Sequence, residues 1–88
     1  MQKLLLFSSK DCQLCEEAQE LFHLSPLRGH FDLEKRDIYQ DKALLLRYKW
    51  SIPVLADEKI TTELKWPFEQ FELDTWLASM LVGEQGAQ

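Results

Sequence analysis

Two cysteines separated by two residues, Cys12 and Cys15, stand where an apolar run gives way to an amphipathic segment. The run at residues 4–7 is typical of a buried strand, and the segment after Cys12 has the apolar spacing of a helix. Residues three apart in a helix lie on roughly the same face, so the two thiols can close into a short disulfide. The pair therefore marks a strand-to-helix turn, and the rest of the chain must be arranged around it.

The position of Cys12 at the first turn of this helix favours its ionised form. Unpaired backbone N–H groups and the positive end of the helix dipole face a sulfur placed there, and Lys10 can add positive charge. In such settings the thiol pKa falls from about 8.5 into a range of roughly 3.5 to 7.5, although Asp11 and the acids behind Cys15 partly offset this effect. We expect Cys12 to be the attacking nucleophile and Cys15, deeper in the helix, to be the resolving thiol.

The length of the chain limits it to one small domain with one core. Its 88 residues are 45% hydrophobic, which is enough apolar surface to fold without disulfide staples. We predict a single domain over residues 1–83, a frayed tail over residues 84–88, and a monomer.

Charge and hydropathy argue against nucleic-acid and membrane partners. The net charge of −5 disfavours non-specific binding to nucleic acid, which relies on Lys and Arg to neutralise phosphates. No stretch approaches the roughly 18 apolar residues of a membrane span, and the N-terminal apolar run is too short for a secretory signal. We therefore expect a cytoplasmic protein. In that compartment a Cys-x-x-Cys pair is more often catalytic or metal-binding than structural.

Apolar spacing and turn residues predict seven elements. These are a strand over 3–8, a helix over 12–24, a strand over 30–38, a helix over 41–50, a strand over 51–56, a strand over 60–65, and a helix from about 68 to 82 that ends at Gly83. The expected inner face of the first long helix carries Leu14, Ala18, Leu21 and Phe22, and that of the last carries Leu73, Trp76, Leu77, Met80 and Leu81.

The element order also predicts the sheet. A right-handed crossover through the first helix makes the first two strands parallel neighbours, and the closing hairpin adds antiparallel strands. The sequence therefore predicts an α/β domain of order β-α-β-α-β-β-α, with a four-stranded mixed sheet flanked by helices.

This order and two motifs resemble the thioredoxin fold and, within it, the glutaredoxins. The motifs are Cys12-x-x-Cys15 at the start of the first helix and Ile52-Pro53 before the third strand. The segments at residues 12–18, 47–55 and 64–68 are similar to the small glutaredoxin-like proteins of bacteria, so the resemblance covers nearly the whole chain. It implies a thiol–disulfide oxidoreductase with a redox-active Cys12–Cys15 disulfide and a role in electron transport.

The resemblance also implies a substrate site. In the wider family the proline that corresponds to Pro53 is cis and lies beside the cysteines, and the backbone of the preceding residue pairs with an extended substrate or glutathione. Ile52 and Pro53 are thus the expected platform, and Lys10 and Trp66 are further expected substrate contacts. Trp50 flanks the same edge.

The implied partners are protein or small-molecule disulfides and an external reductant, with no organic cofactor. Glutathione is one candidate for that reductant. The sequence departs from the glutaredoxins in having Gln13-Leu14 between the cysteines and no Gly-Gly step in residues 61–67.

Two other classes of function stay open. A non-catalytic module of the same fold could hold an extended peptide at the Pro53 edge. A zinc site would need about two further ligands, for which His23 and His30 are the candidates. His23, however, lies about 12 Å along the helix from Cys15, and His30 begins another element. Iron–sulfur binding by cysteines of two subunits with glutathione is the metal alternative that the resemblance implies.

Overall fold

The computed structural model describes the backbone of residues 1–86 and the side chains of residues 1–82. Within this range the elements occur in the predicted order, with two short 3-10 turns added at Arg28–His30 and Ile38–Gln40. The strands and α-helices are β1 (Gln2–Ser8), α1 (Gln13–Leu24), β2 (Phe31–Asp37), α2 (Lys42–Tyr48), β3 (Val54–Asp57), β4 (Glu63–Lys65) and α3 (Gln70–Gly86). None of the helices among the described residues is both long and apolar enough to cross a membrane.

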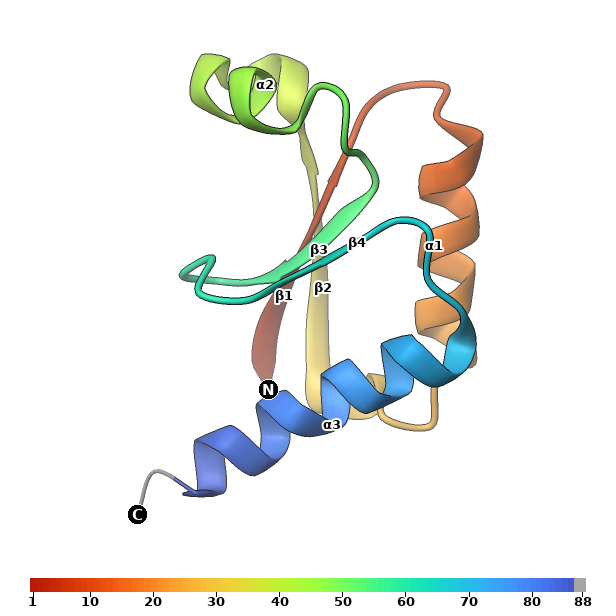
Figure 1. Cartoon of the computed structure of the whole chain (residues 1–88), viewed down its shortest axis with the longest axis vertical. Coiled ribbons are helices and arrows are strands. Elements are labelled where there is room, and N and C mark those ends of the chain that lie inside the picture. The colour runs from red at the N-terminus through yellow and green to blue at the C-terminus, as the bar shows by residue number, and fades with distance from the viewer. Residues whose placement is uncertain (87–88) are drawn as a thin grey trace.

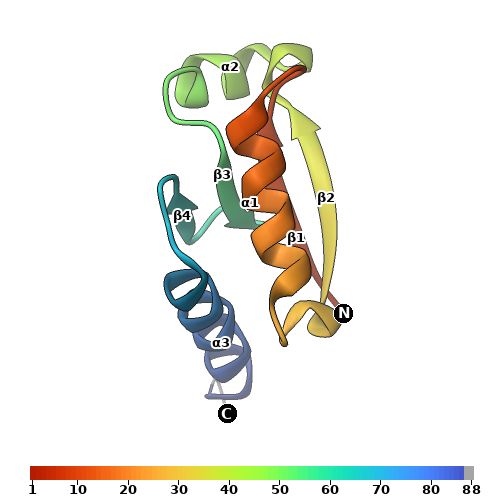
Figure 2. The same ribbon diagram turned by 90° about the vertical axis from the view of Figure 1, so that its right-hand side faces the viewer.

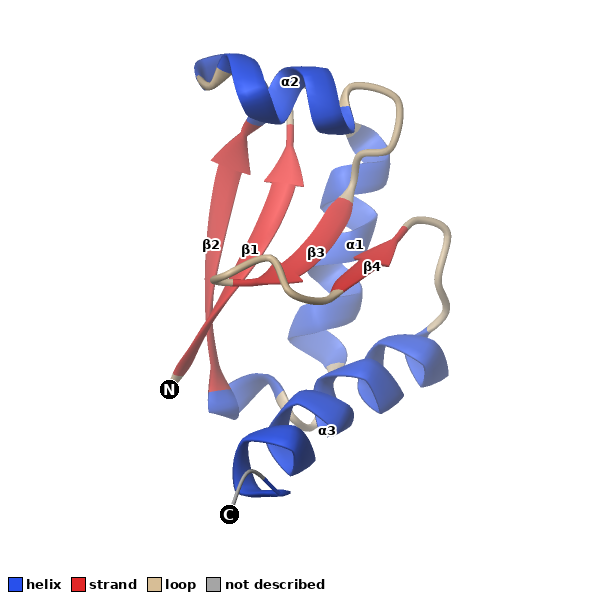
Figure 3. Ribbon diagram, turned by 60° about the vertical axis from the view of Figure 1, so that its left-hand side comes forward, coloured by secondary structure: helices blue, strands red, loops and turns tan. Residues whose placement is uncertain are grey.

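The four strands form one mixed sheet in the order β2-β1-β3-β4, which confirms the predicted sheet (Figure 3). β1 runs parallel to β2 and antiparallel to β3, and β3 and β4 form the closing antiparallel hairpin. Phe7, near the end of β1, pairs with Val54 at the start of β3. The register therefore brings Pro53 next to Ser8, where the chain leaves the sheet toward the cysteines.

Helices cover both faces of the sheet (Figures 1 and 2). Leu4 and Leu6 of β1 belong to the core cluster that includes residues of α1 and α3, whereas Leu5 and Phe7 belong to the cluster that includes Tyr48 of α2. Because successive side chains of a strand point to opposite faces, both sets must be apolar. This explains why the run at residues 4–7 shows no polar alternation.

The inner face of α1 differs from the predicted stripe at its first turn. Cys15, Ala18 and Phe22 are buried, whereas Leu14 is 45% exposed, so the prediction that Leu14 faces the core is wrong. The helix begins at Gln13 with Cys12 as its N-cap, and in this phase residue 15 rather than residue 14 faces the sheet.

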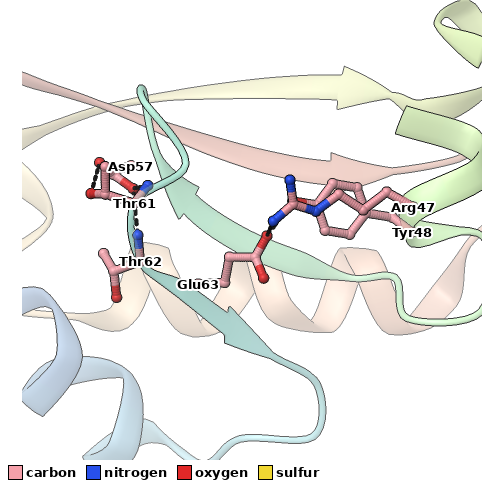
Figure 4. A network of polar contacts seen from close by, with 6 residues as sticks. All are labelled: Arg47, Tyr48, Asp57, Thr61, Thr62 and Glu63. Atoms are coloured by element: carbon pink, nitrogen blue, oxygen red, sulfur yellow. Dashed lines mark hydrogen bonds and ion pairs between the residues drawn. The ribbon is translucent and has the colours of Figure 1, made fainter. Parts of the chain in front are cut away.

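The return strand of the hairpin is shorter than predicted because the turn before it is longer. Asp57 accepts hydrogen bonds from the backbone N–H of Thr61 at 2.6 Å and of Thr62 at 2.9 Å, and also from the Thr61 hydroxyl (Figure 4). Ile60 within this turn has a positive φ of 54°. The segment up to Thr62 is thereby held as a turn, and β4 begins at Glu63 instead of residue 60.

α3 runs past its predicted end. It continues to Gly86, so Gly83 does not terminate it. A glycine ends a helix when it takes a left-handed backbone, and the structure records no glycine with positive φ in the part of the chain it describes. Of the predicted frayed tail at residues 84–88, the first three residues belong to α3, and Ala87 and Gln88 lie outside the described residues.

Candidate functional site

Cys12 and Cys15 lie together at the N-terminus of α1 and are joined by a disulfide, with their Cα atoms 5.2 Å apart. Cys12 is the N-cap of the helix, and its Sγ accepts a hydrogen bond from the backbone N–H of Cys15 at 3.2 Å. Cys12 is half-buried and Cys15 is only 3% exposed. The two sulfurs therefore differ in access, and a helix N–H group points at the more accessible one.

A short loop carries the chain from β1 to this cap. β1 ends at Ser8, and Asp11 takes a positive φ of 55° immediately before Cys12. Aspartate tolerates this left-handed conformation better than most non-glycine residues. The first helical turn then closes with the Glu16 N–H bonded to the Cys12 carbonyl at 3.2 Å.

The Ile52–Pro53 step is tied to its neighbours through its backbone. The peptide bond between the two residues is cis, as is the one between Trp66 and Pro67. The Pro53 carbonyl accepts a hydrogen bond from the Trp66 N–H at 3.2 Å, and the Ile52 N–H donates to the Tyr48 carbonyl at 3.2 Å. Three of the residues expected to contact substrate, Ile52, Pro53 and Trp66, therefore form one connected group.

The tryptophans considered for substrate contact differ sharply in exposure. Trp50 is 90% exposed in the segment between α2 and β3. Trp66 is half-buried against the core, with its ring edge-to-face with that of Phe68 at a centroid distance of 5.0 Å. The indole N–H of Trp76, on the inner side of α3, donates to the Thr62 hydroxyl at 3.0 Å.

A pocket of about 480 Å³ adjoins the cysteines. Its lining includes both cysteines and Lys10, but not Ile52, Pro53 or Trp66. The structure thus places Lys10 with the cysteines in one pocket, and the Ile52–Pro53 group outside its lining. The lining residues are Ser8, Ser9, Lys10, Asp11, Cys12, Cys15, Glu16, Gln19, Glu20, His23 and Lys35.

Two of these lining residues were not predicted to share a pocket with the cysteines. Lys35 comes from β2, and it reaches the pocket because the parallel register pairs it with Leu6 of β1. His23 lies at the far end of α1 on the same side of the helix. The wall mixes carboxylates and ammonium groups, which suits a polar ligand more than an apolar one. Among the described residues, no three His, Cys, Asp or Glu side chains are grouped so that they could hold a metal ion.

The sheet order, the Cys-x-x-Cys pair at the start of α1 and the Ile52–Pro53 step before β3 define a thioredoxin-like fold. Residues 3–78 match the family model of the glutaredoxin-like domain (DUF836). The chain belongs to this family, as its resemblance to the small glutaredoxin-like proteins indicated.

Solved structures agree with this assignment. The chain is similar to the structural genomics target protein XcR50 from X. campestris, with 33% sequence identity in both its X-ray and solution structures. The X-ray structure gives a TM-score of 0.75 over 86% of this chain and 96% of that chain; the solution structure gives 0.73 over 90% and 95%. A malarial protein at 22% identity, with a TM-score of 0.53 over 89% of this chain and 93% of that chain, shares the fold. The comparison with curated proteins finds no match.

Proposed function

We propose that this protein is a thiol–disulfide oxidoreductase in which Cys12 attacks and Cys15 resolves. The observation that carries the proposal is the hydrogen bond from the Cys15 N–H to Cys12 Sγ at the N-terminus of α1. The same N–H stabilises negative charge on the sulfur once the disulfide is reduced. The difference in exposure supports these roles, because the attacking sulfur must reach a substrate and the resolving sulfur only has to reach its partner.

The reaction moves two electrons from the dithiol to the substrate. The Cys12 thiolate attacks one sulfur of a substrate disulfide, the S–S bond of the substrate breaks, and its other sulfur leaves as a thiolate that takes up a proton. Cys15 then loses its proton and attacks Cys12 Sγ. The Cys12–Cys15 disulfide forms as the second substrate sulfur leaves, and this oxidised form is the one in the structure.

The Ile52–Pro53 step is the proposed platform for the substrate chain. Register supports this role, because Pro53 stands beside Ser8 at the start of the loop that leads to Cys12. The Ile52 N–H already donates to Tyr48. An extended substrate would therefore pair with the Ile52 carbonyl, or would displace the internal bond. Trp66 borders the platform and Lys10 borders the pocket, and we propose both as substrate contacts.

The proposed substrates are protein or small-molecule disulfides. An external thiol, for which glutathione is one candidate, would reduce the Cys12–Cys15 disulfide again, and no organic cofactor enters the cycle. We propose the cytoplasm as the compartment, since its thiol pools keep such pairs in the reduced, active form.

The test is to trap the mixed disulfide. Cys15→Ser, incubated with a peptide disulfide, should accumulate a covalent adduct on Cys12 that dithiothreitol releases, because no second thiol can resolve it. Cys12→Ser is the matched control, and its adduct should form far more slowly than that of Cys15→Ser, because the only thiol left is the buried Cys15. A peptide that binds both variants equally, without any adduct and without being reduced by the wild type, would instead identify a non-catalytic binding module.

A further inference from the structure

We propose that Tyr48 is a positioning residue for the Ile52–Pro53 platform, acting through its hydroxyl bond to Glu63. This inference rests on the proposed function, because the platform has a role only if a substrate is held there. Tyr48 itself touches no cysteine and is not offered as a catalytic residue.

The side chain of Tyr48 links two elements across the sheet (Figure 4). It is 1% exposed, and its ring stacks on Phe7 of β1 with centroids 4.5 Å apart and planes 16° from parallel. Its hydroxyl donates to Glu63 Oε2, and Arg47 Nη2 donates to the same oxygen at 3.2 Å. The end of α2 is thereby tied to the start of β4 and to the strand that leads to Cys12.

The backbone completes a closed ring of contacts around the platform. The Tyr48 carbonyl accepts the N–H groups of Ser51 at 2.9 Å and Ile52 at 3.2 Å. The Pro53 carbonyl accepts the Trp66 N–H, and Trp66 follows directly after β4. One path from Tyr48 to β4 therefore runs through the platform, and the other runs through the Glu63 carboxylate. Removing the hydroxyl breaks the second path, so that only the backbone hydrogen bonds still hold the platform.

The link is suited to a permanent support. Burial, aided by the bond to Glu63, raises the pKa of Tyr48 to about 12, so the hydroxyl stays a donor at every physiological pH. The Glu63 side chain is only 19% exposed, and its carboxylate is ion-paired with Arg47, so water competes little for the hydrogen bond from Tyr48. The cysteine pair, by contrast, depends on the N-terminus of α1, to which this link makes no bond that the structure describes.

These contacts predict a separation of two measurable properties. Tyr48→Phe keeps the ring on Phe7 and removes only the hydroxyl. It should lower kcat/KM for a peptide disulfide by about tenfold, mainly through KM, because a displaced platform loses binding energy that the ground state and the transition state share. The midpoint potential of the Cys12–Cys15 couple should stay at the wild-type value. Glu63→Gln should act in the same direction, and the double variant should lose no more than about what Tyr48→Phe loses.

The matched control lies in the turn of the same hairpin, two residues before Glu63. Thr61→Val also removes one hydroxyl that donates to a carboxylate, at 2.6 Å to Asp57, but at the turn rather than beside the platform. It should leave both kcat/KM and the potential unchanged. Thermal denaturation of each variant identifies any that fails to fold, and Glu63→Gln keeps the test decisive if Tyr48→Phe does.

The outcomes distinguish the two proposals. An active wild type with equal kcat/KM in Tyr48→Phe and Glu63→Gln would overturn the positioning role. So would a Thr61→Val variant with the same loss, or a loss accompanied by a matching shift in potential. A wild type that reduces no peptide disulfide would overturn the proposed function, and the positioning role with it.

Discussion

Cys12 should react faster than Cys15 with an alkylating reagent once the protein is reduced. Two single-thiol variants isolate the sulfurs: Cys15→Ser leaves Cys12, and Cys12→Ser leaves Cys15. Cys12 is half-buried at the helix cap, whereas Cys15 is 3% exposed. Ionisation and access therefore both favour Cys12.

The size of the effect follows from the N–H group of residue 15, which lies 3.2 Å from Cys12 Sγ and remains in Cys15→Ser because it belongs to the backbone. A hydrogen bond to a charged group contributes about 1.5–3 kcal/mol, which multiplies the ratio of thiolate to thiol by about 10 to 150. Nucleophilicity falls with basicity, with a coefficient of about 0.4–0.5. The net gain in rate over an ordinary exposed thiol is then roughly 4- to 20-fold.

Alkylation by iodoacetamide at about pH 6 measures this gain, because an ordinary cysteine, with a pKa near 8.5, is almost entirely protonated there. Cys12 should exceed a small model thiol by the factor above, and Cys15 should fall below that thiol because it is buried. In concentrated urea the two variants should react at the same rate, which is the control for intrinsic reactivity. Equal rates in the folded variants would refute the assignment of roles.

Three further predictions concern stability. Leu77→Ala removes a fully buried side chain and should lower the free energy of unfolding, measured in urea, by about 2–5 kcal/mol. Leu14→Ala should lower it by less than about 1 kcal/mol. Equal losses would contradict the assignment of Leu14 to the surface. Burial and the bond to Glu63 raise the pKa of Tyr48 from 10.0 to about 12, so the stabilisation present below pH 10 is lost as the pH rises toward 12. The fall in melting temperature at alkaline pH should therefore be smaller in Tyr48→Phe than in the wild type. An identical fall would count against the bond between Tyr48 and Glu63. Burial raises the pKa of Asp57, but hydrogen bonds from Thr61 and Thr62 outweigh it and hold the pKa below 3.8. The stabilisation that this carboxylate gives is present above pH 3.8 and is lost as the pH falls below it, so Asp57→Asn should show a smaller loss of melting temperature in acid. A loss equal to that of the wild type would show that the turn does not depend on this carboxylate.

The parts of the fold that depend on local sequence were predictable. The unbroken apolar run of β1 required cover on both faces of the sheet. α1 and α3 supply it on one face and α2 on the other. A helix was predicted from residue 41, and Asp41 is the N-cap of α2: its carboxylate accepts the N–H groups of Ala43 at 2.9 Å and Leu44 at 3.4 Å. These features follow from side-chain periodicity and capping chemistry within a few residues.

Features that depend on phase or register were not predictable in the same way. Around the axis of α1, Cys15 lies about 20° from Phe22 and Leu14 about 80° from it, so the buried face that holds Ala18 and Phe22 includes Cys15 and leaves Leu14 at its edge. The approach of Lys35 to the cysteine pocket requires the register of two parallel strands. The bond from Tyr48 to Glu63 joins residues that only the β3–β4 hairpin brings together. Each of these features depends on how elements meet, which a single sequence does not specify.

A redox titration of the Cys12–Cys15 pair tests the central claim most directly. The purified protein is equilibrated with dithiothreitol or glutathione buffers of graded potential, and the reduced fraction is measured by thiol labelling. The account predicts one reversible two-electron transition, with the ratio of reduced to oxidised protein changing tenfold per roughly 30 mV, and no such transition in Cys12→Ser. A wild-type protein whose thiols show no reversible transition over the range of these buffers would contradict it.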